Sequence, residues 1–238
     1  MKKIALALAL VASPVSAQDI NTEDFVEANI LSIFYHELGH ALIDVMALPV
    51  FGQEEDAADT ASILLIDSTF DEETAVSIAY DAALGFAAED AANGGDVIWW
   101  SEHGADLQRF YNLVCLFYGA NPDDREDFAE EMELPQERAD GCPDEYDLAI
   151  GSWGPVFDDL SSGKHEGKLG FSGDTETLTG RVIESEVAAL NKEISLPVAV
   201  GVTVEACGEA NAFYDLDARE IIMCLEFEGH LRDLADTL

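Results

Sequence analysis

The sequence predicts an α+β protein that is predominantly α-helical, with a small antiparallel β-hairpin or sheet near the C-terminus. Long segments of the first half carry apolar residues at helical spacing, and one short segment near the C-terminus alternates apolar with small or polar residues. Hydrophobic residues make up 48% of the 238 residues, as in globular chains. No repeat or long linker divides the chain, so we expect one domain over residues 18–238.

Four helices are expected in the first half, over residues 25–46, from about residue 54, over residues 72–92 and over residues 99–118. Pro49 and Gly52 interrupt the chain after the first helix. The second helix opens with acidic residues, which suit the positive end of a helix dipole. Trp99 and Trp100, at the start of the fourth, are expected in the core.

The second half is more mixed. Residues 121–147 are acidic, contain two prolines and are expected to form an excursion from the body, whereas residues 161–174 hold four glycines and are expected to form an exposed loop. Another helix is expected over residues 176–193. Alternating valines over residues 198–204 predict a strand, and residues 221–227 a second one, with a polar turn at residues 215–219 between them.

The N-terminus has the three features of a secretory signal peptide. Lys2 and Lys3 precede a short apolar run over residues 4–12, and residues 15–17 form a small-residue cleavage site. The sequence therefore predicts a signal peptide over residues 1–17 and a periplasmic or secreted protein. No later stretch reaches about 18 uninterrupted apolar residues, so no membrane span is expected after cleavage.

Charge and motif content exclude several function classes. The chain has 49 Asp and Glu against 11 Lys and Arg, a formal net charge of −38. Nucleic-acid binding needs a basic face, so no nucleic-acid partner is expected. Docking on an anionic membrane surface is disfavoured for the same reason. There is no nucleophile elbow, P-loop or dinucleotide fingerprint to support a serine hydrolase, an NTPase or a Rossmann protein.

An even number of cysteines in an exported chain favours disulfide bonds. The four cysteines are Cys115, Cys142, Cys207 and Cys224. Of the three possible connectivities, the sequence-local one is favoured, Cys115–Cys142 with Cys207–Cys224. Zinc binding by cysteine is the weaker interpretation, because no C-x-x-C pair is present.

The first expected helix contains the motif H-E-x-x-H at residues 36–40. Four residues make about one helical turn, so His36 and His40 project from one face and can bind the same metal ion. Zinc accepts such nitrogen ligands and lowers the pKa of a bound water to about 7. Glu37 would stand beside the ion as the general base.

The second expected helix supplies carboxylates after a turn that can fold it back against the first. Glu55 can complete a His₂Glu ligand set and leave one open position, as a catalytic zinc site requires. Asp59 can accept a hydrogen bond from a ligand imidazole, with His36 the favoured donor. Glu54 or Asp56 as the third ligand stays open, since the whole chain is rich in acids.

H-E-x-x-H followed by E-x-x-A-D at residues 55–59 resembles the gluzincin metallopeptidases, notably their CAAX-type and HtpX-like branch and its soluble relatives. Those enzymes carry a later H-x₅-R element, matched here by His103 and Arg109. The resemblance implies that these two residues flank the site and help to stabilise the oxyanion of the tetrahedral intermediate.

The same resemblance implies a substrate-binding edge strand, because Asn211-Ala212-Phe213-Tyr214 is similar to the N-A-F-A motif of that branch. In the family this strand precedes the active helix, but only eighteen residues separate Ala17 from His36. We therefore expect the C-terminal hairpin to supply the strand in a permuted order, with Asn211, Ala212 and Tyr214 binding substrate.

Over its whole mature length the chain also resembles the bacterial "putative metallopeptidase" family of the DUF4344 type, on residues 35–43 with 48–61, 102–116 and 207–224. Together these features predict a zinc-dependent exported peptidase with one zinc ion per chain and a peptide or protein substrate. The alternatives are a noncatalytic periplasmic binding or scaffold protein with a structural metal site, and a calcium-stabilised acidic module.

Overall fold

The computed structural model describes residues 20–238, so the predicted signal peptide lies outside the described residues. The part described is mostly helical with one small sheet, which confirms the predicted fold class. The helices are α1 (Thr22–Val45), α2 (Glu54–Thr69), α3 (Glu72–Ala92), α4 (Asp106–Ala120), α5 (Glu126–Glu131), α6 (Gln136–Ala139), α7 (Cys142–Ser161), α8 (Leu178–Glu193) and α9 (Leu225–Ala235). The strands are β1 (Leu169–Gly173), β2 (Val200–Glu205), β3 (Ala212–Asp215) and β4 (Glu220–Cys224).

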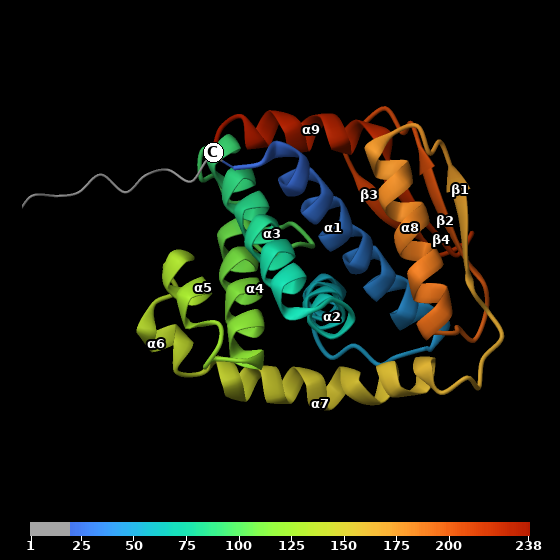
Figure 1. The fold of residues 1–238 in the computed structure, drawn as a ribbon, viewed down its shortest axis with the longest axis horizontal. Helices are drawn as coiled ribbons and strands as arrows, with labels where there is room; N and C mark the ends of the chain where they lie inside the picture. Colours follow the sequence, from blue (N-terminus) through green and yellow to red (C-terminus); the bar gives the residue numbers. More distant parts are fainter. Residues whose placement is uncertain (1–19) are drawn as a thin grey trace, which may run out of the picture.

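Helix α1 runs through the middle of the molecule, with α2, α3 and α4 on one side and α8 and the sheet on the other, while α9 crosses one end and contacts both α1 and α3 (Figure 1). Most of its residues are buried, and Tyr35 and Leu38, which lie next to and within the H-E-x-x-H motif, are fully enclosed. A helix that is apolar all round must be covered on every side. Asn21 caps its N-terminus by accepting a hydrogen bond from the backbone N–H of Glu23 at 3.1 Å.

The sheet is mixed, in the order β1-β2-β4-β3. β3 and β4 form an antiparallel hairpin, whose turn is held by Asp215 accepting hydrogen bonds from the backbone N–H groups of Asp217 and Ala218. β2 and β4, the two strands expected from the sequence, instead pair in parallel. The hairpin partner of β4 is therefore the short strand β3, which lies at the edge of the sheet.

Several expected boundaries were wrong. The glycine-rich stretch contains β1, because Gly167 and Gly173 let the chain approach Val198 and Val204 too closely for any side chain. The last strand ends at Cys224, where α9 begins. The fourth helix begins only at Asp106, so Trp99 and Trp100 are exposed in a loop rather than buried. The acidic excursion contains α5, α6 and the start of α7.

Both disulfides have the connectivity favoured from the sequence. Cys115–Cys142 joins α4 to the start of α7, and Cys207–Cys224 joins the loop after β2 to the end of β4. Disulfides are typical of proteins in oxidising compartments. Within residues 20–238, no helix has the length and apolar character needed to cross a bilayer.

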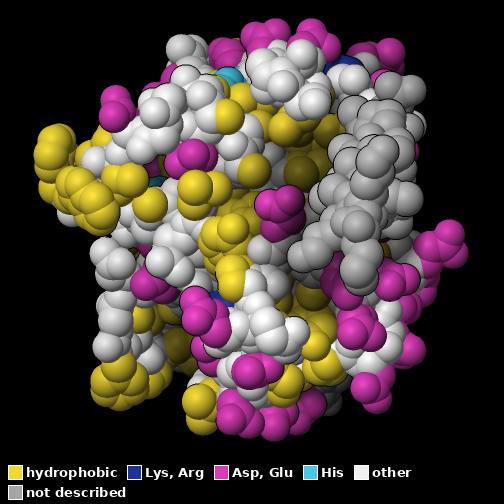
Figure 2. Space-filling view, turned by 90° about the vertical axis from the view of Figure 1, so that its left-hand side faces the viewer, with side chains coloured by type: hydrophobic (Ala, Val, Ile, Leu, Met, Phe, Trp, Pro, Cys, Tyr) yellow, Lys and Arg dark blue, Asp and Glu magenta, His cyan; other side chains and the backbone are white. Residues whose placement is uncertain are grey.

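Acidic side chains are spread over the molecular face in Figure 2, where lysine and arginine side chains are scarce. This distribution agrees with a formal net charge of −38 carried on a folded body. Such a charge keeps molecules apart by mutual repulsion, and it says nothing about chemistry. Function must therefore be sought where acids meet other groups.

Candidate functional site

The site forms where α1 and α2 pack closely against each other. Gly39 lies against Ala58, and a Cβ atom on Gly39 would come within 3.0 Å of the Ala58 Cα and 3.1 Å of its carbonyl oxygen. Such a contact is tighter than most Cβ contacts, so a side chain here would push the two helices slightly apart and glycine favours their close approach. It brings the first turns of α2 to the face of α1 that carries His36 and His40, as the turn between the helices predicts.

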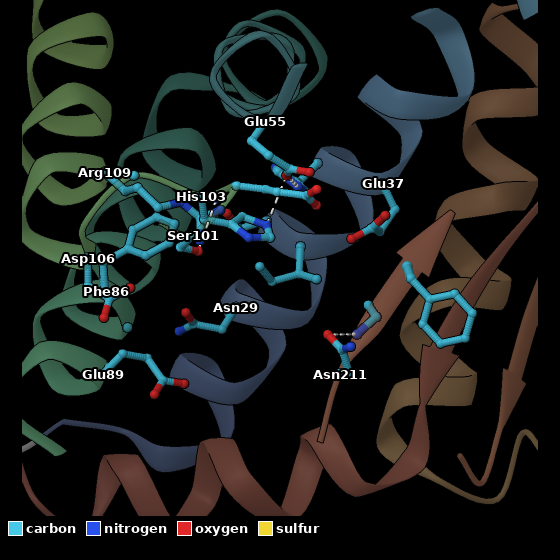
Figure 3. A pocket seen from close by; sticks show the side chains of 18 of the residues that line it. Asn29, Glu37, Glu55, Phe86, Glu89, Ser101, His103, Asp106, Arg109 and Asn211 are labelled. Carbon is cyan, nitrogen blue, oxygen red and sulfur yellow. Dashed lines mark hydrogen bonds and ion pairs between the residues drawn. The ribbon is translucent and has the colours of Figure 1, made fainter. Parts of the chain in front are cut away.

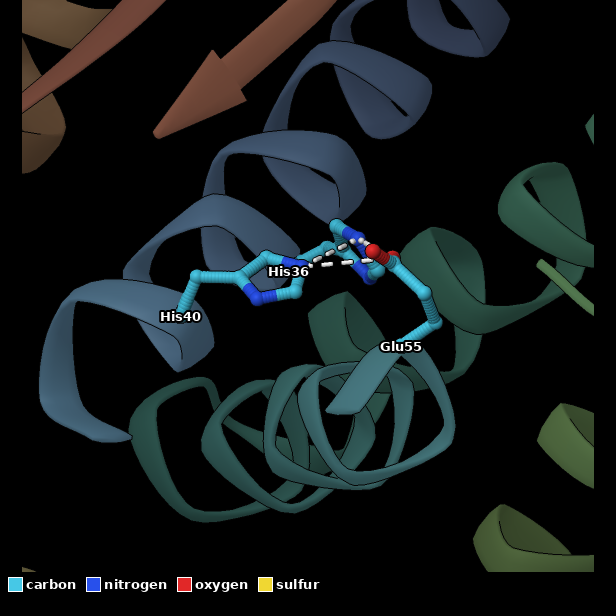
Figure 4. Close-up of side chains that lie close together, drawn as sticks. All are labelled: His36, His40 and Glu55. Carbon is cyan, nitrogen blue, oxygen red and sulfur yellow. Dashed lines mark hydrogen bonds and ion pairs between the residues drawn. The ribbon is translucent and has the colours of Figure 1, made fainter. Parts of the chain in front are cut away.

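Three ligand atoms meet at this contact (Figure 4). The Nε2 atoms of His36 and His40 lie 3.2 Å apart, and each lies 3.2 Å from Oε2 of Glu55. Ligands about 2.0 to 2.1 Å from a tetrahedral zinc ion are separated by about 3.3 Å. The triangle therefore fits a tetrahedral ion with a fourth position left for another ligand. Among the described residues, this is the group that can hold a metal ion.

The other ring nitrogen of each histidine is bound to a carboxylate. Nδ1 of His36 lies 2.7 Å from Oδ1 of Asp59, and Nδ1 of His40 lies 2.9 Å from Oε1 of Glu54. A proton on Nδ1 leaves the Nε2 lone pair of each ring free for a metal ion. Asp59 thus has the position predicted from the sequence, whereas Glu54 contacts His40 rather than joining the ligand group. Asp56 is also outside that group.

Arg109 lies one step away from the ligand atoms. Its Nε and Nη2 donate to the two carboxylate oxygens of Asp59 at 2.8 and 2.7 Å, and its guanidinium lies 4.4 Å from the centre of the Phe86 ring. Sequence reasoning expected Arg109 to flank the ligand group and contact an oxyanion. In the structure its paired donors hold Asp59, which in turn holds His36.

His103 does reach the ligand group. Its Nε2 lies 2.9 Å from Oε2 of Glu55, and its ring stacks on that of His36 with 5.9 Å between centres. The His103 side chain is about half exposed, at 46%. It is therefore the most exposed imidazole of the cluster, compared with 5% for His36 and 12% for His40.

The electrostatics of the cluster are those of a site built for a cation. Hydrogen bonds from His103, His36 and His40 hold the pKa of Glu55 well below its usual range. Burial acts to raise the pKa of Asp59, but the hydrogen bonds from Arg109 and His36 outweigh burial and lower it. Both carboxylates are therefore charged at neutral pH.

Glu37 differs from these acids. It is 6% exposed, and burial raises its pKa, with the three nearby imidazoles acting in the opposite direction. It lines the same cavity as His36, His40 and Glu55. A carboxylate whose affinity for a proton is increased by burial is suited to taking up a proton during a reaction.

The cluster opens into a cavity of about 1330 Å³ (Figure 3). Asn211, Ala212 and Tyr214 line its other side, so the structure brings β3 to the cavity. The Tyr214 hydroxyl donates to Asp44 of α1 at 2.8 Å, and Asn211 Oδ1 accepts from the Ala212 N–H at 2.9 Å. Tyr214 therefore anchors β3 against α1, and the sheet edge faces the space beside the cluster.

Sequence reasoning missed two contributors. Glu54 was considered only as a ligand, although an acid immediately before Glu55 can reach a different histidine. Asn29, on the floor of the cavity, lies seven residues before His36 and so on the same face of α1. That spacing was the available signal, but an asparagine in an apolar helix has many purely structural uses.

The comparisons with known proteins agree with this site. A family model described as "Putative metallopeptidase" (DUF4344) matches residues 7–156 and 175–237. No curated protein and no solved structure matches the chain at a significant level. The two matched stretches include every residue of the cluster and cover most of the sequence. The chain therefore belongs to the DUF4344 family of metallopeptidase-like proteins.

Proposed function

We propose that this protein is an exported zinc-dependent peptidase that hydrolyses peptide bonds. The observation that carries the proposal is the triangle of His36, His40 and Glu55 ligand atoms beside the buried carboxylate of Glu37, open to a large cavity. A purely structural zinc site normally has four protein ligands and is closed, whereas a catalytic site keeps one position open.

The chain's own groups then have distinct tasks. Zinc, when bound, supplies a Lewis acid that activates water and polarises the substrate carbonyl. Glu37 takes the proton of the attacking water and delivers it to the leaving amine. Asp59, held by Arg109, keeps His36 in the orientation that presents Nε2. His103, half exposed beside Glu55, is placed to donate a hydrogen bond to the carbonyl oxygen as it gains charge.

The edge strand β3 is the proposed binding element for the peptide backbone. Among the strands of residues 20–238, β3 pairs with β4 alone, so its other edge can accept a further strand. Asn211 and Ala212 line the cavity at that edge, and Tyr214 fixes the strand to α1. A bound peptide would run along β3 and bring one of its bonds to the cluster, in the permuted order predicted from the sequence.

The test compares wild type with Glu37→Gln, which keeps the shape of the side chain but cannot take up a proton. We expect the variant to retain one zinc ion per chain by elemental analysis and to lose about a thousandfold in cleavage rate on a peptide library read by mass spectrometry. Glu27→Gln, at an exposed residue of the same helix, is the matched control.

A wild-type protein that holds one zinc ion and cleaves no member of a broad library would overturn the proposal. It would favour the noncatalytic scaffold with a structural metal site instead. If protein unfolded by a chelator refolds when calcium is added but not when zinc is added, the calcium-stabilised module would be favoured.

A further inference from the structure

The cavity extends beyond the metal-ligand cluster to a second group of polar side chains. We call this end the acidic recess and define it by Glu89 and Asp90 of α3, Asp106 of α4 and Asn29 of α1. We propose that the acidic recess binds a cationic nitrogen of the substrate, an ammonium or guanidinium group. This inference rests on the proposed peptidase function and names its substrate class.

The three acids line the same cavity because α3 and α4, which carry them, pack side by side. Burial raises the pKa of Asp106, Arg109 and a hydrogen bond from Asn93 oppose that effect, and the like charges of Glu89 and Asp90 act in the same direction as burial, so both of these acids act on Asp106. Figure 3 shows Glu89 and Asp106 on the same side of the pocket, away from Glu37. A cation bound among them would relieve this repulsion.

Asn29 adds an acceptor whose position is fixed. Its side-chain nitrogen donates to the carbonyl oxygens of Phe25 and Asp81 at 2.8 and 3.0 Å, and these two acceptors identify which end of the amide is nitrogen. Oδ1 then lies against Gly85, where a Cβ atom would come within 2.0 Å of it. Asn29 is only 6% exposed, so its orientation is set by the fold.

The Asn29 oxygen is left for a ligand. No hydrogen-bond donor within residues 20–238 contacts Oδ1, yet no fully enclosed side-chain nitrogen or oxygen of the described chain lacks a partner. The oxygen must therefore be accessible, and Asn29 lines the cavity. Figure 3 shows its amide directed toward the side of the pocket where Phe86 and Glu89 lie.

Positive charge from the protein leaves much of the recess unneutralised. Among the described residues that line the cavity, Arg109 is the one with a lysine or arginine side chain. Its paired donors are held by Asp59. His230 lies 2.5 Å from Glu89 and the Asn93 side chain hydrogen-bonds to Asp106, which leaves Asp90, the remaining lone pairs of Asp106 and the Asn29 oxygen as acceptors. A site in which acceptors outnumber donors selects a ligand rich in N–H groups.

The distance from the recess to the cluster fits a peptide. Asn29 and His36 are seven residues apart on α1, about 10 Å along the helix axis. An extended peptide advances about 3.3 Å per residue, so about three residues span the interval. The cation can therefore be an N-terminal ammonium about three residues from the cleaved bond, or a lysine or arginine side chain on a residue nearer to it.

The experiment uses the zinc-loaded full chain and matched peptides. One series places lysine, arginine, glutamine or norleucine at each position of an N-acetylated peptide, and a second compares free with acetylated N-termini. We expect at least a tenfold higher kcat/KM for one cationic series, as charged hydrogen bonds provide. In Asp106→Asn that preference ratio falls by about tenfold. Glu184→Gln, an exposed acid of α8, controls for loss of one charge.

Binding to the Glu37→Gln variant separates this inference from the proposed function. Tighter binding of cationic peptides, lost in the Glu37→Gln/Asp106→Asn double variant, supports the inference even if wild type cleaves nothing. Cleavage with equal kcat/KM for cationic and neutral peptides overturns it and leaves the peptidase intact. A preference unchanged by Asp106→Asn and by Asn29→Leu, with both variants folded by circular dichroism, also overturns it, because the general charge of the protein would then be its cause.

Discussion

Two arginine clusters of the same construction lie along α2. Arg109 hydrogen-bonds to Asp59, and Arg125 hydrogen-bonds to Asp67, which lies two turns after Asp59 on that helix. Each guanidinium also lies over a phenylalanine ring of a neighbouring helix, at 4.4 Å for Arg109 and 3.6 Å for Arg125. By burial and charge pairing alone, neither cluster would be singled out as functional.

The clusters differ in what their carboxylates do next. Around Arg125 every group is used within the protein: the arginine also binds Glu72 and the carbonyl oxygen of Phe117, and Asp67 accepts from Tyr146. Asp59, by contrast, also hydrogen-bonds to Nδ1 of His36, and Nε2 of the same ring is one of the metal-ligand atoms. A buried ion pair therefore indicates function when its carboxylate also holds a residue whose side chain can bind a ligand in a cavity.

The largest expected effect is on stability, at the Arg125 cluster, which we call the closed cluster because its groups are all used within the protein. Arg125→Gln leaves Asp67 and the Phe117 carbonyl without their charged partner in a site where the arginine is 3% exposed. We expect the free energy of unfolding to fall by about 3 to 5 kcal/mol, the usual result of breaking a buried pair. Urea unfolding followed by circular dichroism measures it.

Zinc affinity of the folded Arg125→Gln protein is the control. We expect a change of no more than about twofold, because the two clusters share no partner. A loss of zinc comparable with that of an Arg109 variant would show that the clusters act as one network, and the distinction between them would fail.

At the Arg109 cluster, which we call the open cluster because it ends at the metal-ligand group, the main effect is on metal binding. Arg109→Gln removes the two hydrogen bonds that orient Asp59, and Asp59 then holds His36 less firmly. We expect zinc affinity to fall about ten- to hundredfold, as for other residues that support metal ligands. Competition with a chelating indicator measures it. Arg109→Lys keeps the charge without the paired donors and is expected to lie between wild type and Arg109→Gln.

The next effect concerns pH and has opposite signs for folding and for metal binding. Burial acts to lower the pKa of His36, but hydrogen bonds to Asp59 and Glu55 outweigh it and raise the pKa to about 9 in the metal-free chain. The resulting stabilisation is complete below the unfolded pKa of about 6.5 and is lost as pH rises toward 9. Zinc requires the neutral ring, so its affinity increases over the same interval.

Both slopes approach about 1.4 kcal/mol per pH unit for one proton. Urea unfolding of the metal-free chain and indicator competition, each from pH 6 to 9, measure them. Asp59→Asn is expected to flatten both slopes, whereas Arg125→Gln keeps them because its cluster contains no imidazole. Slopes of the same sign would show that His36 does not titrate as the geometry requires.

The metal-ligand group was predictable from the sequence because its geometry is local. His36 and His40 are one turn apart on a helix, and Glu55 follows after a short turn, so helical spacing alone brings them within reach. The local disulfides were predictable for a similar reason. Asp59 was predicted as a hydrogen-bond acceptor because it lies one turn beyond Glu55.

The remaining contacts depend on how distant elements pack, which spacing does not encode. Arg109 lies fifty residues after Asp59, and only the packing of α4 on α2 decides that its donors meet Asp59 rather than the cavity. β1 was hidden because glycines selected for close approach between strands also suit loops. The parallel pairing of β2 with β4, with β3 at the edge, is a long-range arrangement that the alternation of apolar residues does not specify.

The smallest expected effect compares the two carboxylates that support the histidines. Asp59 is largely buried and held by Arg109, whereas the Glu54 side chain is 47% exposed and hydrogen-bonds to His40. Water can replace an exposed carboxylate as the acceptor for Nδ1, so Glu54→Gln is expected to weaken zinc binding only about two- to threefold. Asp59→Asn, measured by the same indicator competition, is expected to cost at least tenfold. Equal losses would mean that the support of each histidine depends on its carboxylate alone, and the buried arginine of the open cluster would then have no part in holding the metal.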